Sequence, residues 1–173
     1  MERDLFLVRH AKAGLSGGAQ GDFGRPLNGR GRRAAVAVAA ELARRGADPE
    51  LILCSPAIRT RETLDRLLGQ TAPPPVMLEP ALYLAEASAL LARLRALPST
   101  VQRAMLVGHN DGLAELAVTL ATLGAPATLR SLRAKYPAGA VAWLRLPLDD
   151  WSQLGRTRGE LMAFIRPRDL VDG

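Results

Sequence analysis

The 173-residue chain contains two histidines, His10 and His109, and a single cysteine, Cys54. One cysteine excludes an intrachain disulfide framework and a thiolate zinc cluster. Because the chain has only two histidines, any chemistry that depends on imidazole must use one or both of them. Arg9 directly precedes the first histidine, and Arg59 stands in a polar stretch between the two. Imidazole can act as a nucleophile, and guanidinium binds phosphate oxygens bidentately, so this combination suits phosphoryl transfer.

The composition limits the class of protein. Hydrophobic residues make up 48% of the chain and charged residues 23%, which favours a folded domain with its own core over a disordered or membrane-spanning chain. The length predicts a single domain over residues 1–173. The net charge of +6 favours anionic ligands, from phosphate to nucleic acid, but it also fits an arginine-rich surface without a special partner. The first residues do not form a signal peptide, so we expect a cytoplasmic protein.

Strand-like and helix-like patterns alternate along the chain. Short apolar runs that predict strands lie at residues 5–8, 50–54, 76–78, 104–107, 139–144 and 161–165, and the first is typical of a strand covered on both faces. Helical patterns lie at residues 28–45, 56–68, 87–97 and 113–120. Asn28 is expected to cap the first helix and Gly46 to end it, whereas Ser55 and Pro56 are expected to start the second. Gly124 is expected to end the last. This alternation predicts a layered α/β fold with a mainly parallel sheet.

The residues with chemical potential follow the predicted strands. Arg9 and His10 end the first strand, Arg59 lies in the first turn after the second, and His109 follows the strand at 104–107. Ligands of parallel sheets bind at the carboxyl ends of the strands, so these side chains are expected at one edge. The transition state of phosphoryl transfer spreads negative charge over three oxygens, and fixed cations stabilise that charge. No metal ion or other cofactor is suggested by the sequence.

Five segments carry a resemblance to a known family. They are LVRHA at residues 7–11, DFGRPLNGRG at 22–31, LCSPAIRTRET at 53–63, Leu-Tyr at 82–83 and LVGHNDGL at 106–113. The first resembles the Arg-His-Gly signature of the histidine phosphatase, or phosphoglycerate mutase-like, superfamily. The ordered set is similar to its short SixA-type phosphohistidine phosphatases. The resemblance implies a three-layer α/β/α sandwich with a mainly parallel central sheet and no cap domain.

The resemblance also implies a role for each matching residue. His10 would be the nucleophile that becomes phosphorylated, and Arg9, Arg59 and His109 would complete the phosphate pocket. Ser16 lies where relatives often place a polar phosphate contact. Arg25 would fix the loop structure or recognise the substrate beyond its phosphate.

The proton donor to the leaving group has no clear counterpart. Glu86 and Asp111 lie near the positions where larger relatives place an acid, but helix capping explains both residues equally well. Ala11 also replaces the glycine of the signature. The P–N bond of phosphohistidine is labile and its leaving group can be protonated from solvent, so a missing acid favours phosphohistidine over alkyl phosphates.

The expected activity is the metal-independent hydrolysis of phosphohistidine on a protein, with inorganic phosphate as product. One alternative with the same chemistry is a phosphomonoesterase acting on a sugar phosphate or a nucleotide. A different class is a module that binds phosphate, phosphohistidine or nucleic acid without cleaving it. Nucleic acid and membranes are not expected partners, because the basic residues do not gather in an aromatic-rich patch and no apolar stretch is long enough to span a bilayer.

Overall fold

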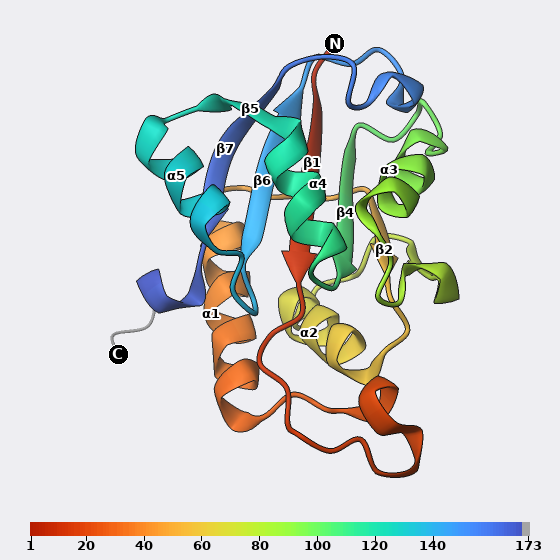
Figure 1. Cartoon of the computed structure of the whole chain (residues 1–173), viewed down its shortest axis with the longest axis vertical. Helices are drawn as coiled ribbons and strands as arrows, with labels where there is room; N and C mark the ends of the chain where they lie inside the picture. Colours follow the sequence, from red (N-terminus) through yellow and green to blue (C-terminus); the bar gives the residue numbers. More distant parts are fainter. Residues whose placement is uncertain (171–173) are drawn as a thin grey trace.

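The computed structural model describes residues 1–170, and its centre is one twisted sheet (Figure 1). The strands of this sheet are β1 (Arg3–Arg9), β2 (Leu51–Cys54), β3 (Val76–Leu78), β4 (Arg103–Gly108), β5 (Ala121–Gly124), β6 (Val141–Leu146) and β7 (Gly159–Ile165). Their order is β3-β2-β4-β1-β6-β7-β5. The β1–β4, β2–β4, β2–β3 and β5–β7 pairs are parallel, whereas β6 runs antiparallel to β1 and β7. The predicted mainly parallel sheet is confirmed.

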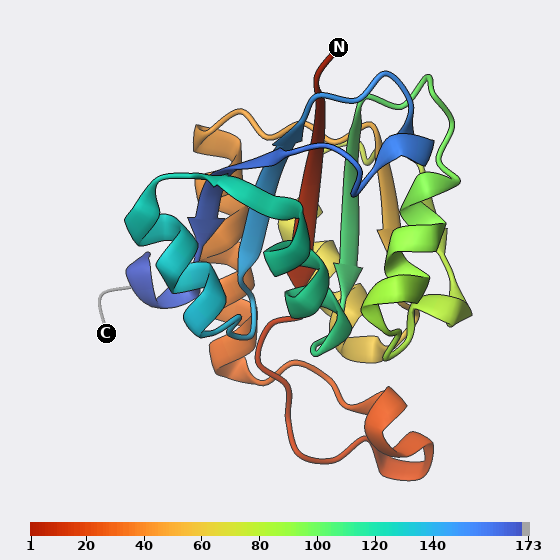
Figure 2. The same ribbon diagram turned by 45° about the horizontal axis from the view of Figure 1, so that its top comes forward.

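Helices cover both faces of the sheet (Figure 2). The α-helices are α1 (Gly29–Arg44), α2 (Ile58–Leu68), α3 (Ala87–Arg95), α4 (Gly112–Leu120) and α5 (Pro126–Ala134). Short 3-10 segments are η1 (Gly18–Gly24), η2 (Pro80–Leu82), η3 (Trp151–Gln153) and η4 (Pro167–Asp169). α1 and α2 lie on one face, and α3, α4 and α5 lie on the other. The three-layer α/β/α sandwich expected from the sequence is therefore confirmed.

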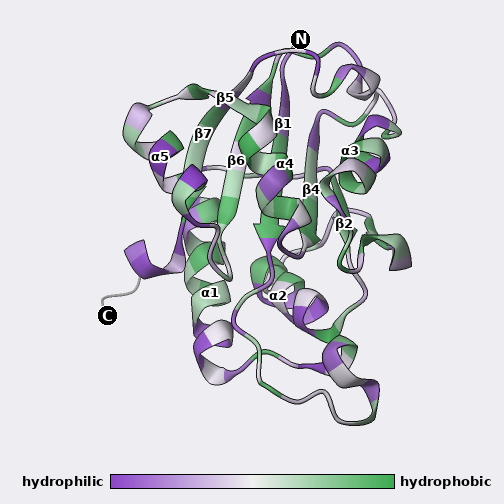
Figure 3. Cartoon of the chain, viewed as in Figure 1, coloured by the Kyte–Doolittle hydropathy of each residue, from purple (hydrophilic) through white to green (hydrophobic). Residues whose placement is uncertain are grey.

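The central strand β1 supplies side chains to both cores because successive residues of a strand point to opposite faces. Leu5 and Leu7 pack with leucines of α3, α4 and α5, whereas Phe6 and Val8 pack with residues of α1 and α2. All four side chains are fully buried. Figure 3 shows the same distribution, with hydrophobic strands between helices whose outer faces are more polar. Burial on both faces explains why β1 is a continuous apolar run.

The sequence predicts the start of the second helix two residues too early. Ser55 and Pro56 were expected to begin it, but α2 begins at Ile58, with Ala57 as its N-cap residue. The chain is still extended at Ser55, whose backbone N–H donates to the carbonyl of Val107 (3.0 Å). The prediction is wrong because pairing with β4 continues one residue past the apolar run.

Residues 121–134 form two elements that the sequence analysis does not predict. β5 is a four-residue edge strand with Thr122 and Leu123 exposed, so it lacks the continuous apolar pattern of the other strands. α5 buries only Leu129 and Leu132. Two buried leucines are too few to give a recognisable helical stripe. The predicted helix over 113–120 is confirmed as α4, but Gly124 ends β5 rather than that helix.

The loop that follows β1 is held against the start of α1. Lys12 O accepts a hydrogen bond from Asn28 N (3.0 Å), and the Asn28 side chain caps α1 by accepting from Gly31 N (2.8 Å). A Cβ atom at residue 31 would lie 2.0 Å from Lys12 O. Only glycine permits this approach, which fixes the backbone two residues after His10. Figure 1 shows the rest of the loop extending beyond the helices.

Within residues 1–170, none of the helices has the length and apolar character needed to cross a membrane. Cys54 is a free, buried cysteine at the end of β2, and burial raises the pKa of its thiol to about 12. A buried cysteine of this kind packs as a small apolar side chain.

Tyr136 is a buried connection between β1 and β6. Its hydroxyl donates to Leu7 O and accepts from Ala142 N, two backbone groups that face each other across these strands. Its own carbonyl accepts a hydrogen bond from Arg9 Nη1 (3.0 Å). Tyr136 therefore links the sheet to the first arginine of the signature.

Replacing Tyr136 with phenylalanine should lower the free energy of unfolding by about 1–3 kcal/mol, because Leu7 O and Ala142 N lose a buried partner. Urea denaturation of the variant and of the wild type measures this difference. Tyr83→Phe is the matched control, since it removes a hydroxyl near the surface and should cost less. Equal stability of Tyr136→Phe and the wild type would contradict the assigned connection.

Candidate active site

Two histidines meet at the carboxyl edge of the sheet. β1 and β4 are parallel neighbours, with Arg9 opposite Gly108 in the register. The next residues along the two strands are His10 and His109, whose ring centroids are 5.4 Å apart. β2 lies on the other side of β4, so α2, which follows β2, brings Arg59 to the same edge. The structure thus brings together the four residues that the sequence assigns to the phosphate pocket.

The His10 ring has a defined proton arrangement. Its Nδ1 lies 2.7 Å from the carbonyl oxygen of Ala11. A carbonyl only accepts, so Nδ1 carries the hydrogen and Nε2 carries the free lone pair. Burial lowers the pKa of His10 to about 4, and the nearby charges of Arg59 and Arg9 act in the same direction. The imidazole is therefore neutral near pH 7.

The backbone of the signature is tied to α2. Ala11 N donates to Thr63 Oγ1 (2.9 Å), and the same hydroxyl donates to Arg59 O (2.7 Å). Thr63 thus links Ala11, whose carbonyl binds the His10 ring, to Arg59, the expected phosphate-binding cation on α2. The sequence analysis does not assign a role to Thr63, whose only signal is its place one turn after Arg59 on the helix.

His109 is buried and held from two sides. Its Nδ1 lies 3.3 Å from Arg59 Nη2, and its Nε2 lies 2.8 Å from Ser55 Oγ. Guanidinium has no acceptor, so Nδ1 accepts and Nε2–H donates to Ser55. Burial is the main cause that lowers the pKa of His109 to about 3, and the positive charge of Arg59 acts in the same direction. Ser55 therefore orients His109, a role that the sequence analysis does not assign.

The two arginines are fixed by backbone oxygens. Arg9 Nη1 donates to Tyr136 O (3.0 Å) and Arg59 Nη1 to Asp22 O (2.7 Å). The Nε atoms of both side chains are buried and have no hydrogen-bond partner within residues 1–170. A buried N–H group that lacks a hydrogen-bond acceptor lowers the stability of the folded protein. The site thus holds two guanidinium groups in fixed positions, and guanidinium binds phosphate oxygens.

A carboxylate missed by the sequence analysis lies among these cations. Asp22 Oδ2 accepts from Arg59 Nη2 (2.9 Å) and from the Tyr83 hydroxyl, and Oδ1 accepts from Arg25 Nη1 (2.9 Å). The Tyr83 hydroxyl, with Arg25 and Arg59, holds the pKa of Asp22 well below its ordinary value. Asp22 is therefore ionised. Its place in the DFGRPLNGRG segment, three residues before Arg25, is the signal that could have identified it.

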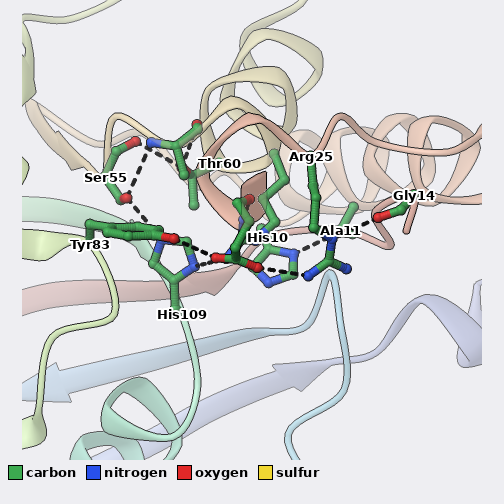
Figure 4. A network of polar contacts seen from close by, with 11 residues as sticks. His10, Ala11, Gly14, Arg25, Ser55, Thr60, Tyr83 and His109 are labelled. Atoms are coloured by element: carbon green, nitrogen blue, oxygen red, sulfur yellow. Dashed lines mark hydrogen bonds and ion pairs between the residues drawn. The ribbon is translucent and has the colours of Figure 1, made fainter. Parts of the chain in front are cut away.

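Tyr83 packs against several residues of the site. Its ring packs edge-on against His109, with centroids 5.4 Å apart, and against Phe23, at 5.1 Å. The Arg59 guanidinium lies 5.9 Å from the centre of the Tyr83 ring, within reach of a cation–π interaction. Figure 4 shows the polar network from Ser55 and His109 past His10 to Arg25 and Gly14. Aromatic packing on η1 and on the segment after η2 thus frames the pocket.

The two weaker substrate contacts predicted from the sequence lie in the loop after β1. Arg25 Nε donates to Gly14 O (2.7 Å), so this side chain holds the loop together as well as binding Asp22. The exposed Ser16 hydroxyl accepts from Gly18 N (3.3 Å). Its partner is therefore its own loop, and a phosphate contact for Ser16 stays a prediction.

The two candidate acids lie at helix starts. Glu86 and Asp111 occupy the N-cap positions of α3 and α4, and both are exposed. Within the described chain, neither side chain accepts a hydrogen bond from its helix, although Asp111 lies near enough to Arg9 to oppose the lowering of the pKa of Arg9 by burial. A catalytic role for either carboxyl group stays a prediction.

Several arginines outside the candidate site bind other groups of the protein. Arg44 and Arg45 form ion pairs with Glu41 on the surface of α1, and Arg32 donates to Leu27 O (2.9 Å). These contacts agree with the interpretation of the arginines as helix surface charges. Among residues 1–170, no cluster of three or more His, Cys, Asp or Glu side chains is arranged to hold a metal ion.

Comparisons with known proteins agree with the geometry. The family model described as histidine phosphatase superfamily (branch 1) matches residues 5–88. An uncharacterised protein of Mycobacterium leprae is 30% identical over 165 residues, which cover 93% of this chain and all of that relative.

Solved structures extend the likeness to the whole fold. A proposed phosphohistidine phosphatase SixA from Nakamurella multipartitia is 29% identical, with a TM-score of 0.82 over 97% of this chain and 98% of that chain. A second, from Agrobacterium tumefaciens, is 28% identical, with a TM-score of 0.80 over 95% and 98% of the two chains. The chain therefore belongs to the histidine phosphatase superfamily, and its SixA-type resemblance holds in three dimensions as well as in sequence.

Proposed function

We propose that this protein is a single-domain phosphatase that hydrolyses phosphohistidine on another protein through a phosphoryl intermediate at His10. The observation that carries the proposal is the hydrogen bond from His10 Nδ1–H to Ala11 O, which leaves the Nε2 lone pair free. The guanidinium groups of Arg9 and Arg59 flank this nucleophile, and no metal ion or cofactor takes part. The SixA-type neighbours, described as phosphohistidine phosphatases, support the same substrate class.

In the first step, the lone pair of His10 Nε2 forms a bond to phosphorus as the bond to the leaving group breaks with its electron pair. The hydrogen on Nδ1 stays in place, so the phosphorylated ring carries a positive charge. Ala11 O faces that N–H and stabilises the charge. The guanidinium groups of Arg9 and Arg59 stabilise the negative charge that spreads over the phosphoryl oxygens.

In the second step, water attacks phosphorus and the P–Nε2 electron pair returns to the ring. His10 is again neutral with its hydrogen on Nδ1, and both hydrogens of the water leave with the phosphate. The ring needs no proton donor in this step, because the Nδ1 hydrogen makes neutral imidazole the leaving group. Ala11 O thus supports the nucleophile in the first step and the leaving group in the second.

The need of a leaving group for a proton supports phosphohistidine, and not an alkyl phosphate ester, as the substrate. An alkoxide is a poor leaving group and needs a positioned acid. Asp22, the carboxyl group nearest the arginines, is held ionised by Tyr83, Arg25 and Arg59, so it cannot protonate a leaving group near pH 7. Phosphohistidine avoids this need, since its ring can carry a proton on the nitrogen that is not phosphorylated.

Rapid acid-free quenching during turnover of a histidine-phosphorylated protein should trap one phosphoryl group on the peptide that contains His10. Because His109 is the only other histidine, peptide mass analysis distinguishes the two positions. His10→Ala should abolish both the trapped group and phosphate release, since the nucleophile is lost. Release from small phosphate esters is measured in parallel.

His109→Gln is the matched control, because it removes the other imidazole and keeps the nucleophile. It should slow turnover but keep the phosphoryl group on the His10 peptide. Hydrolysis of small esters without hydrolysis of phosphohistidine would favour the phosphomonoesterase alternative. Binding of phosphohistidine without any trapped group or released phosphate would show a non-catalytic module.

Carbon-13 NMR titration of the two histidine rings should give midpoints near pH 4 for His10 and near pH 3 for His109. Both values lie below the ordinary value of 6.5, so the unfolded chain binds more protons than the folded one in this range. The unfolding free energy should therefore fall as the pH decreases from about 7 toward 4. A midpoint at or above 6.5 for His10 would contradict the neutral nucleophile.

A further inference from the structure

The mechanism proposed above leaves the Asp22 carboxylate without a role. Dianionic phosphate binds arginine, yet both Nη atoms of Arg59 donate to this aspartate, one to its carbonyl and one to its carboxylate. An anion in an anion-binding pocket weakens the binding of any phosphate by repulsion. Its presence therefore needs a compensating interaction with another part of the substrate.

The position of Asp22 indicates which part of the substrate that is. The Asp22 side chain is 45% exposed, whereas the Arg59 side chain beneath it is 3% exposed. The carboxylate thus lies nearer the solvent than the Arg59 guanidinium to which it is bound. The leaving group of a phosphoryl transfer to His10 lies on the side of phosphorus opposite the nucleophile, because attack and departure are in line. With the phosphoryl group bound between His10 and Arg59, a leaving group directed toward the solvent would come near this exposed carboxylate.

We propose that the Asp22 carboxylate accepts a hydrogen bond from the distal ring nitrogen of the substrate phosphohistidine and so selects a substrate ring that can leave as neutral imidazole. This inference rests on the proposed function. Asp22 would act on the substrate ring as Ala11 O acts on the His10 ring, by holding a hydrogen on the nitrogen that is not bonded to phosphorus. An aspartate does this more strongly than a carbonyl because it is charged.

The atoms balance without any proton transfer in the step. The substrate ring enters with hydrogen on its distal nitrogen and phosphorus on the other. His10 Nε2 forms its bond to phosphorus, and the electron pair of the broken P–N bond returns to the substrate ring. The substrate leaves as neutral imidazole, and the positive charge passes to the His10 ring. Asp22 stays ionised throughout, consistent with its low pKa.

The loop that carries Asp22 allows the carboxylate to leave Arg59 for the substrate. All seven residues of η1 are exposed or half-buried, and the helical turns are interrupted at Gly21, which has a φ of 59°. When a phosphoryl group takes the Nη atoms of Arg59, the carboxylate keeps Arg25 Nη1 and the Tyr83 hydroxyl as donors. Arg25 and Tyr83 thus hold the carboxylate on the solvent side of Arg59.

Charge around the carboxylate sets the expected selectivity. Arg25 faces it from the same loop, Arg59 from α2 and Tyr83 from the segment after η2, with His109 behind Arg59. A leaving group with an N–H donor gains a hydrogen bond there, whereas a leaving group that departs as an anion is repelled. The site should therefore prefer phosphohistidine to aryl phosphates through Asp22 itself.

The test compares kcat/KM of the whole protein and of Asp22→Asn on a histidine-phosphorylated peptide and on p-nitrophenyl phosphate. Asparagine keeps the shape of the side chain and removes its charge. The value for the phosphohistidine peptide should fall by roughly tenfold or more relative to the value for p-nitrophenyl phosphate, because only the first substrate loses a hydrogen bond to the carboxylate. Asp22→Glu should retain the preference for phosphohistidine, since it keeps a carboxylate.

The pH profile gives a readout that a purely structural role of Asp22 would not change. In the wild type, the carboxylate holds the proton on the substrate ring, so kcat/KM for the peptide should decline only at alkaline pH. In Asp22→Asn that decline should move to lower pH. Asp65→Asn, which removes an exposed carboxylate in the second half of α2, is the matched control and should leave both the ratio and the profile unchanged.

Each outcome separates the inference from the function on which it rests. A wild type that releases no phosphate from the phosphohistidine peptide overturns the proposed function and the inference together. An active wild type with equal losses on both substrates in Asp22→Asn overturns the inference alone. An Asp22→Asn variant with an unchanged substrate ratio and pH profile also overturns it.

Discussion

Parallel pairing between β1 and β4 determines where every group of the site lies. It sets Arg9 opposite Gly108, so the chain leaves both strands at the same level and His10 and His109 follow side by side. A shift of the register by one residue would turn the side chains of one strand to the opposite face and separate the two rings. The buried residues on both faces of β1 oppose such a shift, because it would disrupt the packing of Leu5 and Leu7 in one core and of Phe6 and Val8 in the other.

One acidic residue, Asp22, offsets part of the positive charge of the three arginines at the site. Arg9, Arg25 and Arg59 are cationic, both histidines are neutral near pH 7, and Asp22 is anionic. Two net positive charges therefore meet a phosphate dianion. Neutral histidines serve both proposed steps, since a protonated His10 could not attack phosphorus. Burial, the main cause of the lowered pKa of His10, is thus part of the chemistry and not only of the packing.

The sequence predicts the strands that carry the site because their apolar runs are continuous, and it predicts α1 from the Asn28 cap and its periodic core residues. It does not predict β5 or α5, whose apolar patterns are sparse. Arg9 and His10 are readable because they directly end a strand. The sequence analysis assigns no role to Asp22, because its contacts with Arg59 and Tyr83 join segments 37 and 61 residues away. No local pattern encodes such contacts.

A crystal structure with orthovanadate tests the central claim most directly, since vanadate imitates the five-coordinate phosphorus of the transition state. The account predicts vanadium bonded to His10 Nε2, with its oxygens within hydrogen-bond distance of Arg9 and Arg59. Vanadate bound elsewhere, for example in the surface hollow lined by Arg32, Arg33 and Arg66, with nothing bound at His10, would contradict it.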